Sequence, residues 1–446
     1  MSENQSGGNT GRGSLSVRNI EPTITDPSSI VFPSMVPVRQ RFPQDRVEDV
    51  ERAVLQQLEP FAELDLAGKE IAVTAGSRGI KGMAEVLRAI VIQLREWGAV
   101  PFLVPAMGSH GGATAEGQIA VLKKLGITEA ETGAPIRSSM EVVDLGMTAQ
   151  GAPIHCDKLA FQSGGIVVCN RIKAHTSFRS DQESGLVKMM LIGLGKHKGA
   201  TDFHAIGFER FDAVLSEAGR LFLEKAPVLF GVGLVENAYG QVAAIEAAAP
   251  EDLIDREREC LRYAKTIMGR ILVPEIDVLI VDEIGKDISG AGMDPNITGR
   301  SAYGLPGFDL ASRIQRIIVR GLTKATAGSA MGIGTADFTT RRCVEQIDLA
   351  VTYTNAVTAR IPAAPKIPMI AENDRSALVM ALKTARIPSS PEAKIVQIRN
   401  TKDLEDIWVS EACLAGLAHS DSLPVRGKPQ PFRFDEAGEL LPWSGS

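Results

Sequence analysis

Apolar residues recur at helical spacing and then in short runs along most of the chain. Val47, Val50, Val54 and Leu58 follow the period of an amphipathic helix, and the apolar run at 69–75 predicts a strand. The same alternation predicts helices over 83–97 and 114–125, and strands at 101–105, near 142 and at 166–169.

A second series of elements follows the first. Apolar runs at 227–235 and 276–281 are bounded by Pro, Gly and Asp, as buried strands usually are, and 251–268 predicts a charged helix between them. Further elements are predicted at 317–321, 375–386 and 393–399, with a glycine-rich segment at 328–338. Strands that alternate with helices indicate βαβ units, so the fold class is α/β with mainly parallel or mixed sheets.

The length of 446 residues favours two domains, each large enough to bury its own core. Residues 1–18 are rich in Gly, Ser and Asn and are interpreted as a disordered tail. We predict an N-terminal α/β domain over 19–270, a C-terminal α/β domain over 271–423, and a Pro/Gly-rich surface tail over 424–446.

Composition excludes several classes of protein. Hydrophobic residues make up 44% and charged residues 23%, as in ordinary globular proteins. The net charge of −6 and the lack of a basic cluster argue against a nucleic-acid partner. No leader-like segment and no long uncharged run predicts export or a membrane span. The five scattered cysteines form no C-x-x-C pair, which favours a reducing cytoplasm.

Three of the six histidines sit in glycine- or serine-flanked turns that follow predicted strands, and two of these are the main candidates. His110 comes after the strand at 101–105, and His175 comes after the strand at 166–169. Ligands of open α/β sheets bind at the carboxyl ends of strands, so both are candidates for a site. The alternative for each is a turn histidine that hydrogen-bonds to the backbone.

Lys188 lies within the unusually apolar segment 184–198, where a lysine is costly to bury unless it is paired or used covalently. The alternative is a lysine that extends along a helix edge to reach water. His204 follows sixteen residues later. His197, between two lysines, is interpreted as solvated, and His155 and His419 as structural or surface residues.

The order and spacing of these residues resemble the nickel-dependent lactate racemases and related 2-hydroxyacid racemases and epimerases. That family has a G-x-H turn, here Gly108-Ser109-His110, and a second histidine after a later strand, here His175. It also has an S-G-x-x-K segment followed by a glycine, here 184–188 with Gly193, and a histidine sixteen residues beyond the lysine, here His204. The similarity covers roughly residues 30–420.

The resemblance implies an isomerase with two α/β domains and an active site in the cleft between them. Lys188 would hold a nickel-pincer nucleotide through a thioamide, and His204 would coordinate the nickel. His110 and His175 would act as paired acid and base while the α-hydrogen of a 2-hydroxyacid passes reversibly to the cofactor as hydride. Cofactor-assembly proteins are then the expected partners.

The resemblance is incomplete at the residues that would bind the substrate carboxylate. Arg78 is the best candidate by position, but the family pattern D-x-T-R reads Ala75-Gly76-Ser77-Arg78 here, without the aspartate. Arg78 pointing to solvent in a tight turn is the alternative. In the C-terminal domain no lysine matches the family's second substrate contact; Arg300 or Lys286 could replace it, or 287–300 could be a polar loop.

Two other functions compete with the racemase. The histidines could bind a metal ion in a hydrolase or lyase, which requires His110, His175 and His204 to converge. The chain could also be a non-catalytic nucleotide-binding α/β protein. Lys188 distinguishes these readings, because only the tethered cofactor needs its amine.

Overall fold

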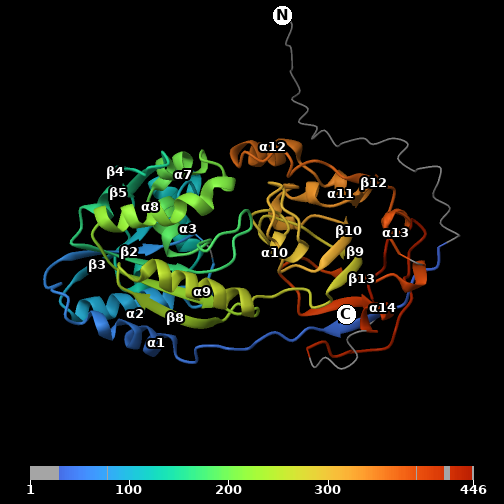
Figure 1. Ribbon diagram of the computed structural model, residues 1–446, viewed down its shortest axis with the longest axis horizontal. Coiled ribbons are helices and arrows are strands. Elements are labelled where there is room, and N and C mark those ends of the chain that lie inside the picture. The colour runs from blue at the N-terminus through green and yellow to red at the C-terminus, as the bar shows by residue number, and fades with distance from the viewer. Residues whose placement is uncertain (1–29, 78, 388, 416–421, 444–446) are drawn as a thin grey trace, which may run out of the picture. The chain divides into compact units, whose positions relative to one another are not determined.

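The computed structural model describes residues 30–77, 79–387, 389–415 and 422–443, so the predicted tail at 1–18 lies outside the described residues. The chain forms two compact units, both α/β (Figure 1). The five-stranded unit, named after its main sheet, holds Phe42–Gly269 and Leu305–Gly307. The seven-stranded unit holds the chain before Phe42, Arg270–Gly304 and the chain from Phe308 onward.

The main sheet of the five-stranded unit is parallel except at one edge. Its order is β3 (Val100–Pro105), β2 (Glu70–Ala75), β6 (Gly165–Arg171), β7 (Val228–Glu236) and β8 (Val242–Ala248). Only β8 pairs antiparallel with its neighbour. The predicted strand near Val142 is β4 (Val142–Met147), which pairs with β5 (Pro153–Asp157) outside this sheet.

Alternate residues of β6 pack into hydrophobic cores on opposite faces of this sheet. Val167 and Cys169 join the core with α1 (Val50–Leu58) and α2 (Met83–Glu96). Ile166 and Val168 join the core with α8 (Phe211–Lys225) and α9 (Leu253–Ile267). A strand buried on both faces reads as a continuous apolar run, which is why the sequence located it. The remaining helices are α3 (Ala115–Lys124), α4 (Glu129–Thr132), α5 (Lys158–Phe161), α6 (Leu186–Lys188) and α7 (Lys196–His204).

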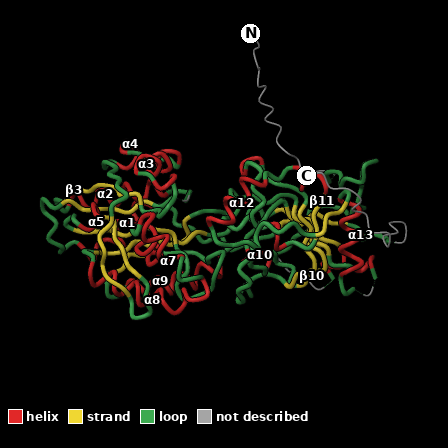
Figure 2. Tube along the Cα trace, turned by 90° about the horizontal axis from the view of Figure 1, so that it is seen from above, coloured by secondary structure: helices red, strands yellow, loops and turns green. Residues whose placement is uncertain are grey.

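The seven-stranded sheet has a parallel centre and an antiparallel edge. Its order is β1 (Met35–Arg39), β14 (Asp406–Ser410), β13 (Ile395–Ile398), β9 (Glu275–Val281), β10 (Arg313–Val319), β11 (Phe338–Thr340) and β12 (Met369–Ala371). The strands from β13 to β12 are parallel, whereas β14 is antiparallel to both β13 and β1. Much of this unit is loop, drawn green in Figure 2. Its helices are α10 (Pro295–Thr298), α11 (Arg341–Glu345), α12 (Leu349–Thr358), α13 (Asp374–Thr384) and α14 (Glu411–Leu414).

Both ends of the described chain belong to the seven-stranded unit, which differs from the sequence-based division. That division assigned 19–41 to the N-terminal domain, but β1 pairs with β14. The sequence-based division missed this pairing because the two strands are distant in sequence. It also treated 424–446 as a surface tail, but Leu440 and Trp443 are buried in the core of this unit. Their apolar side chains are isolated among polar residues, so periodicity gave no signal.

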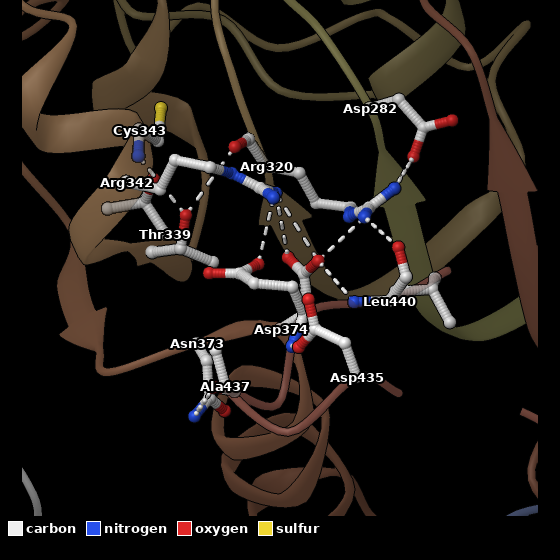
Figure 3. Close-up of polar contacts among 12 residues, drawn as sticks. Asp282, Arg320, Thr339, Arg342, Cys343, Asn373, Asp374, Asp435, Ala437 and Leu440 are labelled. Atoms are coloured by element: carbon white, nitrogen blue, oxygen red, sulfur yellow. Dashed lines mark hydrogen bonds and ion pairs between the residues drawn. The ribbon is translucent and has the colours of Figure 1, made fainter. Parts of the chain in front are cut away.

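An ion-pair network fixes the C-terminal segment to the sheet (Figure 3). Arg320, directly after β10, pairs with Asp282 and with Asp374, both at 2.6 Å. The backbone N–H of Leu440 donates to Asp374 at 2.9 Å, and its carbonyl accepts from Arg320 at 3.1 Å. The segment therefore covers polar groups at the carboxyl ends of the parallel strands.

Candidate functional site

The loops that follow β2, β3 and β6 meet at one edge of the five-stranded sheet. These strands are neighbours and run parallel, so their carboxyl ends lie side by side. Ser77 follows β2, His110 follows β3 and His175 follows β6. The structure thus brings both predicted histidines to the edge at which α/β sheets bind ligands.

His110 is exposed in a turn that packs against the segment carrying Lys188. The turn needs Gly108, whose φ is +61°, and the N–H of Gly108 donates to the carbonyl of Gly193 at 3.3 Å. Gly193 ends the π-helical turn that begins directly after Lys188. On the imidazole, Nδ1 contacts the hydroxyl of Ser77, which fixes the ring orientation.

A buried polar network supports the His110 turn. Gln118 of α3 donates to the carbonyls of Gly108 at 2.8 Å and of His110 at 3.5 Å. Lys196 donates to Gln118 at 3.2 Å and pairs with Asp157 at 3.0 Å, and both partners of this ion pair are fully buried. Burial lowers the pKa of Lys196, and the Asp157 carboxylate opposes that shift. A buried pair of this kind fixes one geometry for the turn.

His175 lies in a loop whose two ends are hydrogen-bonded to each other and whose interior contains a carboxylate acceptor. Lys173 and Ser184 exchange backbone hydrogen bonds of 2.8 and 3.2 Å. Within the loop the buried Glu183 accepts from the N–H of His175 at 2.6 Å and from Arg179 at 2.9 Å. The position of the His175 backbone is therefore set by a carboxylate in its own loop.

Lys188 is half-buried at the end of the short helix α6. The buried Glu257 of α9 accepts from the N–H of Val187 at 2.8 Å, and burial raises the pKa of Glu257 to about 7. Gly185 is needed for this approach, because a Cβ there would lie 2.5 Å from the Glu257 carboxyl carbon. The amine of Lys188 contacts Nε2 of His175, so two predicted site residues meet directly.

His204 is the exposed last residue of α7 and lies beside an aromatic cluster. Its ring is parallel to that of Phe211, with centroids 6.1 Å apart, and it lies 5.6 Å from Phe208. The His175 ring is 5.8 Å from the same Phe208. Burial holds the pKa of His175 well below its usual value, and neighbouring cations act in the same direction. His175 is therefore a neutral imidazole at pH 7.

The residues predicted to bind the substrate carboxylate are Arg78 and, in the C-terminal domain, Arg300 or Lys286. Arg78 lies outside the described residues. Arg300 pairs with Asp337 at 2.7 Å and donates to backbone carbonyls of its own unit, and Lys286 donates to Asn355 at 2.7 Å. These contacts account for Arg300 as a structural residue of the seven-stranded unit.

Sequence reasoning did not find the residues that hold the site together. Lys196 precedes the exposed His197 and reads as part of a charged surface, yet it is fully buried with a positive φ. Ser77, Glu183 and Glu257 are ordinary polar residues whose partners are distant in the fold. The only available signal was the cluster of glycines around 185–199, which permits close packing.

Within residues 30–77, 79–387, 389–415 and 422–443, no three His, Cys, Asp or Glu side chains come together in a group that could hold a metal ion. None of the helices in that part of the chain is long and apolar enough to cross a membrane.

Comparison with known proteins finds a likeness among solved structures. No protein-family model matches the chain, and no curated protein matches it. Among solved structures the chain is similar to the lactate racemase apoprotein from Thermoanaerobacterium thermosaccharolyticum, with a TM-score of 0.50 and 13% identity. The match covers 83% of this chain and 99% of that chain. At this identity the likeness shows the fold, and the α/β architecture predicted from sequence is confirmed.

Proposed function

We propose that this protein is an isomerase, a racemase or epimerase of a 2-hydroxyacid, that holds a nickel-pincer nucleotide through Lys188. The observation that carries the proposal is the contact between the Lys188 amine and the His175 imidazole at the carboxyl edge of the sheet. The fold shared with a lactate racemase apoprotein supports it.

The residues present fit such a cofactor. Lys188 offers an amine for a covalent link, and His204 offers an imidazole, a suitable nickel ligand. Both residues are neighbours of His175, the first by direct contact and the second through Phe208. When bound, the cofactor would take up and return the α-hydrogen of the substrate.

The two histidines would handle the hydroxyl proton of the substrate. Inversion of a carbon requires a proton acceptor for each of two enantiomers, and His110 and His175 supply one each. His175 is suited to accept a proton because it is neutral at pH 7. His110 is oriented by Ser77 and by the Gln118 network beneath its turn. Arg78, three residues after the last residue of β2, would bind the substrate carboxylate.

The competing metal-dependent hydrolase is less well supported. Nδ1 of His175 accepts from the N–H of Ser177 at 3.0 Å, and Nε2 contacts Lys188. Both ring nitrogens are thus engaged by the protein, whereas a metal ligand needs one of them. We further propose a cytoplasmic location, because all five cysteines are free and buried. Cofactor-assembly proteins are the proposed partners, because the nickel-pincer nucleotide must be built and loaded onto the chain.

The test is intact-protein mass spectrometry with nickel analysis, on protein co-expressed with cofactor-assembly proteins. We expect an adduct of several hundred daltons on Lys188 and about one nickel per chain. Lys188→Arg, which keeps a long polar side chain but cannot form the link, should carry no adduct. Unmodified Lys188 in cells that load a known racemase would overturn the proposal.

The roles of the histidines are tested on the loaded protein. His110→Ala and His175→Ala should each abolish inversion of the substrate while the adduct is retained, and His204→Ala should lower the nickel content. Inversion by either of the first two variants would contradict the two-base assignment.

A further inference from the structure

We infer that His175 keeps the Lys188 amine unprotonated in the cofactor-free protein, so that this chain presents a ready nucleophile for acylation. The inference deepens the proposed function and rests on it for the identity of the acyl group. The reactivity itself belongs to Lys188 and His175 and is measurable without cofactor.

The hydrogen bonds of the His175 ring determine the protonation state of Lys188. The N–H of Ser177 donates to Nδ1 at 3.0 Å, and a neutral imidazole has only one acceptor nitrogen. Nε2 therefore carries the ring proton and directs it at the Lys188 nitrogen. An ammonium has donors only, so this contact is a hydrogen bond only when the amine is neutral and accepts.

The ring of His175 is held in this orientation. Its backbone N–H donates to Glu183 at 2.6 Å, and its carbonyl accepts from Arg179 at 2.8 Å. The Phe178 ring packs on the imidazole with centroids 4.5 Å apart. A ring flip would replace the Ser177 contact with a carbon atom, so these contacts favour the Nε2–H form.

Charges on the surrounding elements also favour a neutral amine. Lys173, Arg179 and His204 add to the positive potential around His175. The buried carboxylate of Glu183 is already paired with Arg179 and with Lys265 of α9. Glu257, which accepts from the backbone N–H of Val187 beside Lys188, has a pKa raised to about 7, which limits its negative charge. The charged groups that act on His175, on its loop or on the helix of Lys188 include Lys173, Arg179, Glu183, His204, Glu257 and Lys265.

The chemical step is an acyl transfer to nitrogen. The lone pair of the Lys188 amine attacks the carbonyl or thiocarbonyl carbon of an activated acyl donor, and a C–N bond forms. The bond between that carbon and its leaving group breaks, and the leaving group takes the electron pair. The nitrogen then releases one proton to water, because Nε2 of His175 is already protonated. The product is an amide or thioamide, and no oxidant or reductant is needed.

The protonation state of Lys188 is tested by competitive labelling of the cofactor-free protein with trace acetic anhydride from pH 6.5 to 9. Peptide mass spectrometry measures the labelling of each lysine. An ordinary lysine is neutral in roughly 1 of 2,500 molecules at pH 7. The exposed Lys123 and Lys124 on α3 serve as internal references, and their rates should rise about tenfold per pH unit. Lys188 should react at least about 30-fold faster than these at pH 7 and change less than about twofold over the range.

Variants separate the histidine from simple burial of the lysine. His175→Leu should restore a roughly tenfold rise per pH unit at Lys188. His197→Leu, at an exposed position on α7, is the matched control and should not change the profile. Circular dichroism checks that each variant folds, and the wild-type profile tests the inference without any variant.

The outcomes distinguish this inference from the proposed function. A wild-type Lys188 rate that runs parallel to Lys123, or a flat profile in His175→Leu, overturns the inference even if the nickel-bearing adduct forms in cells. A flat, fast Lys188 that disappears in His175→Leu supports the inference even if no adduct is found.

Discussion

At the carboxyl edge of the seven-stranded sheet, charged side chains face charged side chains of opposite sign. Arg320 lies between Asp282 and Asp374, and Arg342 pairs with Glu439 at 2.9 Å. At the same edge of the five-stranded sheet, the imidazoles of His110 and His175 contact a hydroxyl, a backbone N–H and an amine. The first edge is covered by the chain's own residue Leu440 and its neighbours.

This difference indicates which of the two sheet edges is available for chemistry. Arginine–carboxylate pairs engage the charged groups of the seven-stranded edge with one another, so this edge stabilises the fold. Imidazoles and an amine keep proton-transfer and bond-forming capacity, so the five-stranded edge is the candidate site. The Lys196–Asp157 pair is the structural exception at that edge, and it lies beneath the His110 turn.

The largest effect is expected where a carboxylate is removed from the seven-stranded edge. Asp374→Asn removes a buried carboxylate and leaves the partly buried Arg320 with Asp282 as its remaining carboxylate, and we expect the free energy of unfolding to fall by about 4 kcal/mol. Denaturant titration measures this. Arg399→Ala, which removes an exposed pair with Glu283, is the control and should cost less than about 1 kcal/mol. Equal losses would remove the contrast between a buried network and surface pairs.

The second-largest loss of stability is expected at the buried Lys196–Asp157 ion pair of the five-stranded edge. Lys196→Met leaves Asp157 buried without its cation, and we expect a loss of about 3 kcal/mol in denaturant titration. The double variant with Asp157→Asn should recover most of the loss, because no uncompensated charge remains. Hydrogen exchange at 106–113 should be faster in Lys196→Met than in the wild type. Unchanged exchange there would show that the pair does not support the His110 turn.

A smaller effect is expected at the helix that carries Lys188. Glu257→Leu leaves the buried N–H of Val187 without its acceptor, which should cost about 2 kcal/mol. Glu257→Gln keeps an acceptor and should be nearly neutral at pH 6. Because the pKa of Glu257 is raised to about 7, the folded protein binds a proton that the unfolded chain releases above its usual pKa. The wild type should lose stability from pH 4.5 to 7, and Glu257→Gln should lose less over that window.

The smallest effect is a pH dependence at the seven-stranded edge. Burial and the neighbouring Asp374 raise the pKa of Glu439 to about 7. Its contribution is therefore most favourable below its usual pKa and is lost as the pH rises towards 7. Glu439→Gln should match the wild-type melting temperature at pH 5 and slightly exceed it at pH 8. A lower melting temperature at pH 8 would mean that the Arg342 pair outweighs the repulsion from Asp374.

Sequence patterns located the elements that are buried on both faces or carry a clear helical period. The runs at 69–75, 166–169 and 276–281 became β2, β6 and β9, because a strand between two helical layers must be apolar throughout. The amphipathic period at 83–97 became α2, because one apolar face of this helix packs into a core. β1 and the buried Trp443 were not assigned correctly, because their partners β14 and Gln397 are distant in sequence.

For the candidate site, the sequence by itself determined which residues could carry chemistry and that they follow strands. His110, His175 and Lys188 were identified by rare residue types in glycine-rich or apolar surroundings, which are local properties of the chain. Only the tertiary structure decided that His175 meets Lys188, that Ser77 contacts His110, and that Lys196 is buried. These contacts join loops from different strands, and their geometry depends on the packing of the whole sheet edge rather than on any local pattern.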